Sequence, residues 1–515
     1  MADHDNPKHP QQPNDDIEQA SATHRDSSTS LSTSKWTEFS IFDRRQKALL
    51  VAIVSIAATF SGAASNIYFP ALSTIADDLG VSIELINLTV TTYLIFQGLA
   101  PSLWGPVSDV HGRRVALLGT FLVFLGACIG LACSQNYATL LVLRCLQSTG
   151  SASTIALGSG VIGDITTRAE RAGFMGIFQA GLLAPVAIGP IIGGALADSL
   201  GWRSVFWFLV IYGGCYFFVI VAFLPETLRS LVADGSHIPE SRKLLIAFPL
   251  SLYQRTTKSG WKVGQPSANE VPPPKRIDFL APFRSLLSKY TAPIIFFMAI
   301  YYAVWQMTIT AMSTLFKTQY GLSELQIGLS FIANGVGCIL GTLFTGKLLD
   351  RNYQRVKRKH QGPEEDLPIE KARLLLVPIF SAIQCLAILL FGWTIAYPHK
   401  VPIAIPIIAT FFVGATAIGM QSGVMTYLVD VYPDQSAAAS ASLNLARCLL
   451  AAGATSLVSP LINAVGVGPA FSIATGVQVL AFAGFIIQWV VVPKWREAKA
   501  NERTASATTT AAAAK

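Results

Sequence analysis

Hydrophobic residues in this chain of 515 residues gather in long runs that short polar segments separate. A membrane hydrocarbon core about 30 Å thick requires roughly 20 apolar residues per helix. Such runs lie at 48–69, 84–104, 115–134, 138–162, 172–197 and 203–224, and after a polar gap at 291–316, 325–349, 374–397, 402–429, 437–460 and 470–493. In lipid each run must be a helix, because a helix satisfies its backbone hydrogen bonds internally. The pattern predicts an all-α polytopic membrane protein with twelve transmembrane helices in two six-helix halves.

The polar segments divide the chain into five parts. We expect a disordered N-terminal tail at 1–45, a six-helix half at 46–225, a central loop at 226–290, a second six-helix half at 291–495 and a C-terminal tail at 496–515. The N-terminal tail is rich in Ser, Thr, Asp, Gln and Pro and lacks the apolar stretch of a signal peptide.

Charge is scarce and unevenly placed. Only 13% of the residues are charged, whereas a soluble domain carries roughly 25%. Basic residues concentrate in the segments on the side of the N-terminus, and the opposite segments hold Arg203, Lys317 and Lys400. Because cytoplasmic segments are enriched in Lys and Arg, we expect both termini and the central loop to be cytoplasmic. This placement accounts for the net charge of +8 without a nucleic-acid partner, and no retention signal argues against the plasma membrane.

The chain shows no pattern typical of an enzyme or of a cofactor site. The seven cysteines form no CxxC pair, and no nucleophile with its base, metal cluster or phosphate-binding loop stands out. We therefore expect no metal and no cofactor. Energy for any transport would come from an ion or solute gradient.

The two halves contain related segments. A shift of 241 residues places Gly105 and Asp109 of WGPVSDVHGRR on Gly346 and Asp350 of FTGKLLDRNYQR, each at the end of the second helix of its half. Two six-helix halves that share such a repeated segment are typical of transporters built from internal repeats.

Several motifs resemble those of the major facilitator superfamily. GPVSDVHGRR resembles its loop motif after the second helix, RCLQSTGSA its fourth-helix motif, and AIGPIIGG the fifth-helix motif of its drug:proton antiporter branch. SNIYFPAL, LPETLR and NLARCLLAAG are similar to fungal members of that branch, which include multidrug exporters and citrate exporters. The resemblance implies a monomer in which substrate binds between the halves and alternating access moves it across the bilayer.

The first motif predicts a conformational latch formed by Gly105, Asp109, Gly112, Arg113 and Arg114. The glycines would permit close helix approach and a tight reversal. The arginines would hold the loop on the cytoplasmic face. Asp109 would meet the positive N-terminus of the helix that begins near DQSAAASAS, in the other half. The alternative is an ordinary charged surface loop.

The fifth span predicts a hinge and packing face. Its members are Gly181, Pro185, Gly189, Pro190, Gly193 and Gly194. Small residues at this spacing let another helix approach, and the eighth span offers Gly335, Gly337 and Gly341 as a partner face. The prolines should bend or loosen the helix. The alternative is tight packing without a hinge.

Polar residues within the spans are the candidate substrate ligands. They are Arg144, Gln147, Gln179, Trp305, Gln306, Asn334, Asn444 and Arg447. A charge at a helix centre costs at least about 2.5–3.5 kcal/mol and is functional by default, so both arginines should face the central cavity. No Asp or Glu lies near the middle of a span. The arginines therefore favour an anionic substrate, and proton coupling would use an edge carboxylate such as Asp164.

These features favour a secondary active transporter that exports drugs, toxins or a secondary metabolite by alternating access and proton antiport. The alternative is an exporter of citrate or a related organic acid. Citrate exporters of the resembling group carry an arginine shortly before the GP of the fifth helix, where this chain has Gln179. A larger, mainly apolar molecule with one anionic or polar group fits better. A non-transporting nutrient sensor is the third reading, although both tails are short.

Overall fold

The computed structural model describes residues 40–235, 237–238, 250, 253, 262–263, 281–359, 369–431 and 436–495. Twelve helices in this described part are long and apolar enough to cross a membrane. The predicted all-α polytopic fold is thereby confirmed. The tails beyond Ser40 and Trp495 and most of the central loop lie outside the described residues, so the five-part division stays a prediction.

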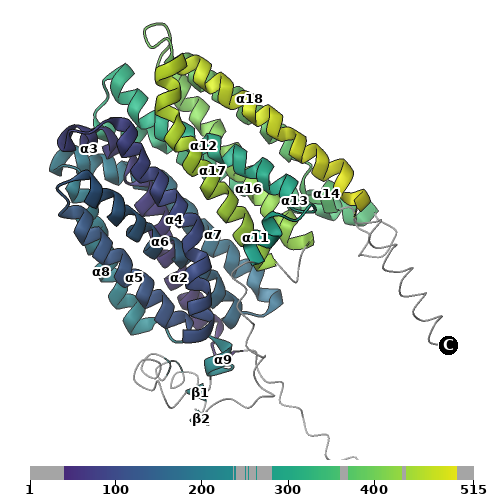
Figure 1. Cartoon of the computed structure of the whole chain (residues 1–515). Coiled ribbons are helices and arrows are strands. Elements are labelled where there is room, and N and C mark those ends of the chain that lie inside the picture. The colour runs from purple at the N-terminus through teal and green to yellow at the C-terminus, as the bar shows by residue number, and fades with distance from the viewer. Residues whose placement is uncertain are drawn as a thin grey trace, which may run out of the picture.

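The helices of the N-terminal half form one bundle (Figure 1). They are α2 (Arg44–Asn66), η1 (Phe69–Ala71), α3 (Leu72–Leu79), α4 (Ile83–His111), α5 (Arg113–Ala132), α6 (Tyr137–Ile165), α7 (Arg168–Leu200) and α8 (Arg203–Phe223). The helices begin where polar side chains cap them. Ser82 accepts a hydrogen bond from the Leu85 N–H at the start of α4, and Asn136 accepts one from the Thr139 N–H at the start of α6.

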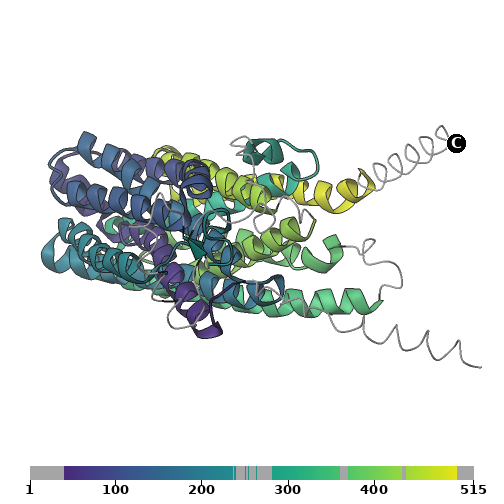
Figure 2. The ribbon, with the colours of Figure 1, turned by 90° about the horizontal axis from the view of Figure 1, so that it is seen from below.

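The helices of the C-terminal half form a second bundle beside the first, and the view from below shows the two sets of helices adjoining (Figures 1 and 2). They are α12 (Ala292–Tyr320), α13 (Glu324–Lys359), α14 (Ile369–Arg373), α15 (Val377–Ile395), α16 (Ala404–Val431), α17 (Ser436–Val465), α18 (Val467–Ile486) and η5 (Ile487–Val491). The part of the chain that links the two halves contains α9 (Arg229–Val232), the paired two-residue strands β1 (His237–Ile238) and β2 (Lys262–Val263), and α11 (Ala281–Leu286).

The two ends of the bundles are named here by the elements that lie at them. The terminal end is where α2 begins and η5 finishes, and the α3 end is the opposite one, where α3 lies (Figure 1). Successive spans run in opposite directions, so the second, fourth and every later even-numbered span finishes at the terminal end.

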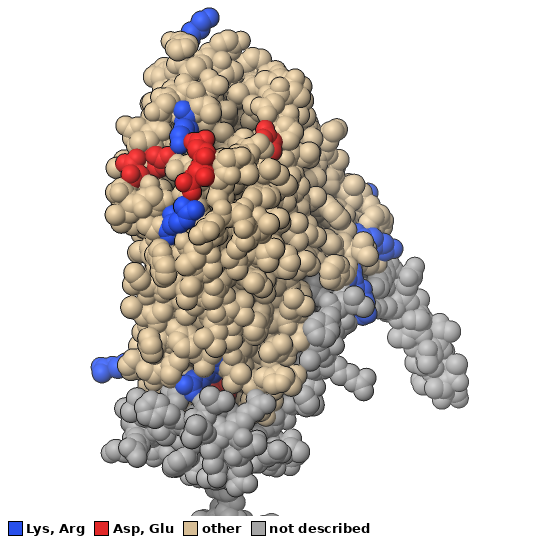
Figure 3. Space-filling model, turned by 60° about the vertical axis from the view of Figure 1, so that its left-hand side comes forward, with Lys and Arg blue, Asp and Glu red and all other residues tan. Residues whose placement is uncertain are grey.

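Apolar side chains fill each bundle and also cover its outside. Phe60 packs against Phe121 and Tyr212 in the N-terminal half, with ring centroids 5.1 and 4.3 Å away. Large apolar side chains such as Phe218 and Leu480 are more than 70% exposed. Charged residues gather near the two ends, and a wide uncharged belt lies between them (Figure 3). Such a belt matches the hydrocarbon layer of a membrane.

Two expected loops are helical. The segment WGPVSDVHGRR continues α4 to His111, and a single residue, Gly112 with φ +109°, separates it from α5. A side chain strongly disfavours this φ, which is why glycine makes the break. Likewise α13 continues through the basic run to Lys359 instead of ending near 349.

Candidate functional site

The two halves contact each other along two helix pairs, α7 with α13 and α4 with α17. In the first pair the backbones come so close that a Cβ has no room. A Cβ on Gly335 would overlap Ala187, one on Gly328 the carbonyl of Pro190, and one on Gly194 the carbonyl of Glu324. Small residues thus let α7 and α13 pack backbone to backbone.

The predicted glycine face of α7 therefore serves two neighbours. Gly181 and Gly189 lie against α2, at Ser55 and Asn66, whereas Gly194 lies against α13. Pro185 also faces α2, where it contacts Gly62. Gly193 adjoins the Ile67 carbonyl of the same neighbour, and Pro190 adjoins Gly328 of α13.

One expectation about this region is wrong. Gly337 and Gly341 do not face α7: they pack on Phe411 and Ala415 of α16, within their own half. Their position in the sequence puts them on the opposite side of α13 from Gly335, since two residues along a helix turn the direction by about 200°. The helix α7 continues through both prolines, and the predicted hinge at them stays a prediction.

The second pair is joined by hydrogen bonds between small polar side chains. Thr91 Oγ1 of α4 lies 2.8 Å from Ser456 Oγ, and Asn87 Nδ2 donates to Ser459 Oγ at 2.9 Å. Nearer the middle of the molecule, Asn444 Nδ2 donates to the Gln97 carbonyl at 3.4 Å. The first two bonds belong to the part of α4 nearest the α3 end, and the third lies at the middle of α4.

An ionic cluster joins the halves at the α3 end itself. Lys317 of α12 binds Glu324 at 3.0 Å and lies 3.8 Å from Asp77 of α3. Thr74 of α3 donates a hydrogen bond to Glu324 and accepts one from Lys317 at 3.3 Å. The cluster links two residues of each half, which adds to the closure of this end.

Toward the terminal end, the faces of α4 and α13 that contact the other half nearer the α3 end no longer contact it. A Cβ on Gly98 of α4 would lie 3.0 Å from Cys448 of α17, but one on Gly105, two turns further, would meet nothing within 4 Å. On α13 the crowded Gly335 is followed three turns later by Gly346, which also has nothing within 4 Å. Residues 7 and 11 apart share a helix face. The halves are therefore in contact at the α3 end and apart at the terminal end.

Arg447 occupies the middle of the C-terminal half. Its Nε and Nη2 donate to Asn444 Oδ1 at 3.1 and 2.8 Å, and its Nη1 donates to Gln421 Oε1 at 3.3 Å. The guanidinium lies 4.6 Å from the centroid of the Tyr302 ring. Arg447 is partly exposed and has no carboxylate partner among the described residues. Its positive charge is available to a ligand that enters between the halves.

Two more predicted ligands adjoin this position. Trp305 lies one turn from Tyr302, with ring centroids 5.2 Å apart, and its indole N–H donates to Asn334 Oδ1 at 3.0 Å. The Nδ2 of Asn334 is buried and has no acceptor among the described residues. Gln306 is also buried, at 5% exposure, next to Trp305 on α12. Arg447, Asn444, Trp305 and Asn334 thus form one cluster, which we name the Arg447 site.

Arg144, which was expected to face the central cavity, is buried within the N-terminal half. Its guanidinium is enclosed in the N-terminal half between the rings of Tyr68 and Tyr93, 3.9 and 4.6 Å from their centroids. Its Nη1 donates to Gln147 at 2.7 Å and to the Ala64 carbonyl at 3.2 Å. Arg144 is 1% exposed, so it does not face an open cavity in this conformation. The two rings cover it, which the sequence position of Arg144 alone did not reveal.

Gln179 lies on the side of α7 between its two packing faces. One face, with Gly181 and Pro185, meets α2, and the other, with Ala187 and Gly194, meets α13. Gln179 lies on the arc between them and is exposed. It therefore faces the space between the halves at the terminal end, away from the Arg447 site.

The predicted latch residues form an ionic network at the terminal end of the N-terminal half. Arg113 binds Asp109 at 2.6 Å and Asp164 at 2.9 Å, and it donates to Ser108 Oγ at 2.9 Å. Arg114 is buried and donates to the Val221 carbonyl at 2.7 Å. Both arginines point into the protein, because carboxylate and carbonyl acceptors lie there, instead of anchoring a loop at the surface.

Asp109 pairs with Arg113 in this conformation, and its side chain is half exposed. Asp109 was predicted to contact the start of α17. The residues before α17, at 432–435, and the side chains of 436–439 lie outside the described part. Gly105, on the same face of α4, has open space in front of it. The latch role stays a prediction for a conformation in which the terminal end is closed.

A buried carboxylate that the sequence reasoning missed anchors this network. Glu226 accepts hydrogen bonds from the backbone N–H groups of Arg113 and Arg114 at 2.8 and 3.2 Å and of Thr227 and Leu228 at 3.0 Å. Burial raises the pKa of the Glu226 carboxyl, and the four N–H groups oppose that shift. A Cβ on Gly112 would overlap this carboxylate. The signal was the glutamate of LPETLR directly after an apolar run.

Metal ligation finds no support in the described part of the chain, where no three His, Cys, Asp or Glu side chains come together as ligands would. Near the middle of the molecule, the hydrogen-bonding groups that join the halves are amides and hydroxyls, and the partly exposed guanidinium of Arg447 lies beside Asn444; the charged groups that join the halves lie at the α3 end. This arrangement can bind and orient a small molecule.

Comparison with known proteins decides the family. The Major Facilitator Superfamily profile matches residues 54–455. The chain belongs to the major facilitator superfamily. It is 39% identical over 481 residues to Citrate exporter 1 of Aspergillus niger, a match that covers 91% of this chain and 90% of the relative. It is 34% identical over 453 residues to MFS antiporter QDR2 of Candida albicans, covering 86% and 88% of the two chains.

A solved structure supports the superfamily fold. A POT family transporter in complex with 5-aminolevulinic acid has a TM-score of 0.63 at 14% identity, and the match covers 87% of this chain and 96% of that one. The resemblance carried by the sequence motifs is confirmed. As a member of the major facilitator superfamily, the chain is a multi-pass membrane transporter, and the relatives named above are transporters and not enzymes.

Proposed function

We propose that this major facilitator protein exports mainly apolar small molecules with one anionic group, such as a drug, toxin or secondary metabolite, in exchange for protons. The observation that carries the proposal is Arg447, a partly exposed arginine of the C-terminal half without a carboxylate partner among the described residues, bonded to the Asn444 that contacts the other half. An uncompensated charge in the membrane interior is unfavourable, and an anionic ligand offsets it.

The surroundings of Arg447 favour one charge on the substrate over three. Arg144 is enclosed by Tyr68 and Tyr93, so a second guanidinium is not accessible in this conformation. Tyr302 and Trp305 give the Arg447 site an aromatic wall suited to an apolar body. These facts support a lipophilic monoanion. The likeness to Citrate exporter 1 supports the alternative, export of citrate or a related organic acid.

Orientation and coupling are parts of the same proposal. We place the terminal end in the cytoplasm and the protein in the plasma membrane as a monomer, on the strength of the basic residues at that end. The conformation described is then open to the cytoplasm, as uptake of an export substrate requires. The relative named MFS antiporter supports exchange. Asp164, paired with Arg113 at 2.9 Å near the cytoplasmic opening, is the candidate proton carrier.

Efflux from a yeast strain without its own exporters tests the proposal. Cells that express the chain would be loaded with labelled citrate, a lipophilic monocarboxylate or a neutral drug, with and without a protonophore. We expect protonophore-sensitive export of the monocarboxylate, and loss of that export in Arg447→Ala with normal protein abundance at the membrane. Export of citrate alone would support the alternative, and undiminished export by Arg447→Ala would contradict the role of this residue.

A further inference from the structure

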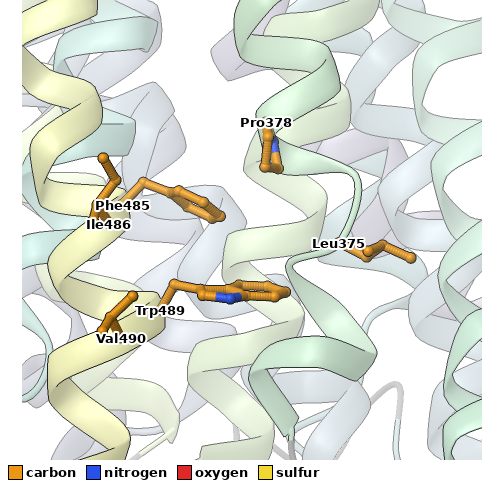
Figure 4. A pocket seen from close by; sticks show the side chains of 6 residues that line it. All are labelled: Leu375, Pro378, Phe485, Ile486, Trp489 and Val490. Carbon is orange, nitrogen blue, oxygen red and sulfur yellow. The ribbon is translucent and has the colours of Figure 1, made fainter.

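A pocket outside the Arg447 site lies on the C-terminal half. It has a volume of about 230 Å³ and sits between α15 and the terminal-end part of α18 (Figure 4). Its lining is entirely apolar or aromatic and comprises Leu375, Pro378, Phe485, Ile486, Trp489 and Val490. Leu375, Ile486 and Val490 are each about half exposed, at 47, 50 and 47%, so the pocket opens on the outer surface of the bundle.

A local change of helix type shapes the pocket. α18 passes into a π-helical turn, η5, at Ile487–Val491, and Trp489 lies in that turn. Single π-turns within α-helices occur frequently at functional sites. The rings of Phe485 and Trp489 lie 5.7 Å apart and both point from α18 across the pocket, toward Pro378 and Leu375 (Figure 4). The indole N–H of Trp489 has no acceptor among the described residues, although its ring is partly buried.

Basic side chains surround the terminal-end side of the pocket. Lys371, in the last turn of α14, stands four residues before Leu375, and Lys494 stands four residues after Val490; both lysines are exposed. Lys289 lies 5.6 Å from the ring of Trp495, next to Lys494. The acidic residue closest in sequence, Glu370, is turned inward, buried and bonded to Tyr427. Basic residues thus stand within four positions of the pocket lining on both of its chain segments.

We propose that this pocket binds one anionic phospholipid of the cytoplasmic leaflet. One acyl chain lies against Phe485 and Trp489, the Trp489 N–H donates to a carbonyl or phosphate oxygen, and Lys371 and Lys494 bind the headgroup. The placement rests on the cytoplasmic orientation proposed above. Anionic lipids are concentrated in that leaflet and are attracted to basic residues beside transmembrane helices.

The size and position of the pocket favour a lipid over a transported compound. Sites for drug-sized molecules have volumes of roughly 300–1,000 Å³, more than this pocket offers, whereas a single alkyl chain is slender. The pocket also lies on the lipid-facing side of α15 and α18, both in the C-terminal half, and the contacts between the halves run through α4, α7, α13 and α17. The lipid can thus stay bound while the halves move.

Native mass spectrometry of the full-length protein tests this site. The protein would be purified in detergent with equal amounts of phosphatidylinositol and phosphatidylcholine. We expect one phosphatidylinositol to remain after delipidation, preferred about tenfold over phosphatidylcholine because two lysines bind its charge. Trp489→Ala should abolish the retention, and the double variant Lys371→Gln with Lys494→Gln should abolish the preference. Trp207→Ala, at a tryptophan 44% exposed on α8, and Lys400→Gln are matched controls that should retain the lipid.

Two results would overturn the lipid site. The first is equal retention of both lipids by the wild type, and the second is unchanged retention in Trp489→Ala. If that variant also exported substrate with an altered KM, the pocket would be assigned to the transported compound. The proposed function is tested separately, because Arg447→Ala should lose export and keep the lipid. Loss of the lipid with intact export would leave the proposed function untouched.

Discussion

Two arginines in the membrane interior have opposite surroundings. Arg447 of the C-terminal half is partly exposed and is held by Asn444 and Gln421, whereas Arg144 is 1% exposed and lies between two tyrosine rings. The two arginines therefore differ in what they contact. Arg447 is the residue that we propose to pair with an anionic ligand, and Arg144 ties α6 to the end of α2 through the Ala64 carbonyl.

Arg144→Gln should affect stability more than substrate affinity. It removes a guanidinium stacked on Tyr68 and Tyr93 and leaves the space between the rings poorly filled. We expect a loss of about 2–3 kcal/mol in the free energy of unfolding, seen as a lower Tm of the purified protein. The matched variant Arg447→Gln should keep the Tm within a degree or two. A normal Tm with lost substrate binding in Arg144→Gln would reassign Arg144 to the substrate.

Glu226→Ala should destabilise the junction between α4 and α5. The change leaves the N–H groups of Arg113, Arg114, Thr227 and Leu228 without their common acceptor. A loss of about 3 kcal/mol is expected, because unpaired buried N–H groups each cost about 1–3 kcal/mol. Glu226→Gln keeps an acceptor oxygen and resembles the protonated form that burial favours, so its Tm should fall less. Equal losses in both variants would contradict this role.

The sequence could identify polar residues in the spans but not their accessibility. Arg144 and Arg447 look alike in their hydrophobic surroundings, and the rings that enclose Arg144 come from residues 76 and 51 positions earlier in the chain. Glu226 was overlooked for the same reason, since its partners lie 112 and 113 positions away. Such pairings depend on which helices become neighbours, which local patterns do not specify.

At the scale of elements, glycine faces decide where helices of the two halves meet. The regular spacing of small residues in α7 and α13 was visible in the sequence. In the structure the small residues of α7 contact α2 and α13, and those of α13 contact α7 and α16. The number and limits of most spans were predictable because the hydrophobic runs have membrane length. The continuation of α13 to Lys359 was not, because polar sequence at the surface does not distinguish a helix from a loop.

Gly105→Leu and Gly346→Leu should each trap the transporter open at the terminal end. Both glycines continue faces that pack between the halves nearer the α3 end, and both have open space in this conformation. A leucine fits here but would keep α4 from α17, or α13 from α7, when the terminal end closes. Export should fall at least about tenfold, whereas substrate binding from the cytoplasmic side should persist. Gly126→Leu, at an exposed glycine of α5 with nothing within 4 Å, is the control and should export normally. Normal export by both variants would contradict closure through these faces.

At the scale of the whole molecule, closure of one end and separation of the other define one state of an alternating-access cycle. The α3 end is held by backbone packing of α7 on α13, the hydroxyl and amide contacts of α4 with α17, and the ionic cluster around Lys317. These contacts must break when that end opens. The Arg447 site lies between the two ends, where either opening can expose it in turn.

The most direct test of the account compares binding of a lipophilic monocarboxylic acid with binding of its neutral amide to the purified transporter. The two ligands have nearly the same shape and differ in charge. We expect the wild type to prefer the acid at least about tenfold, since its charge would pair with Arg447 in the membrane interior. Arg447→Gln should lose that preference, and Arg144→Gln should keep it. A preference that survives Arg447→Gln, or equal binding of both ligands by the wild type, would contradict the central claim.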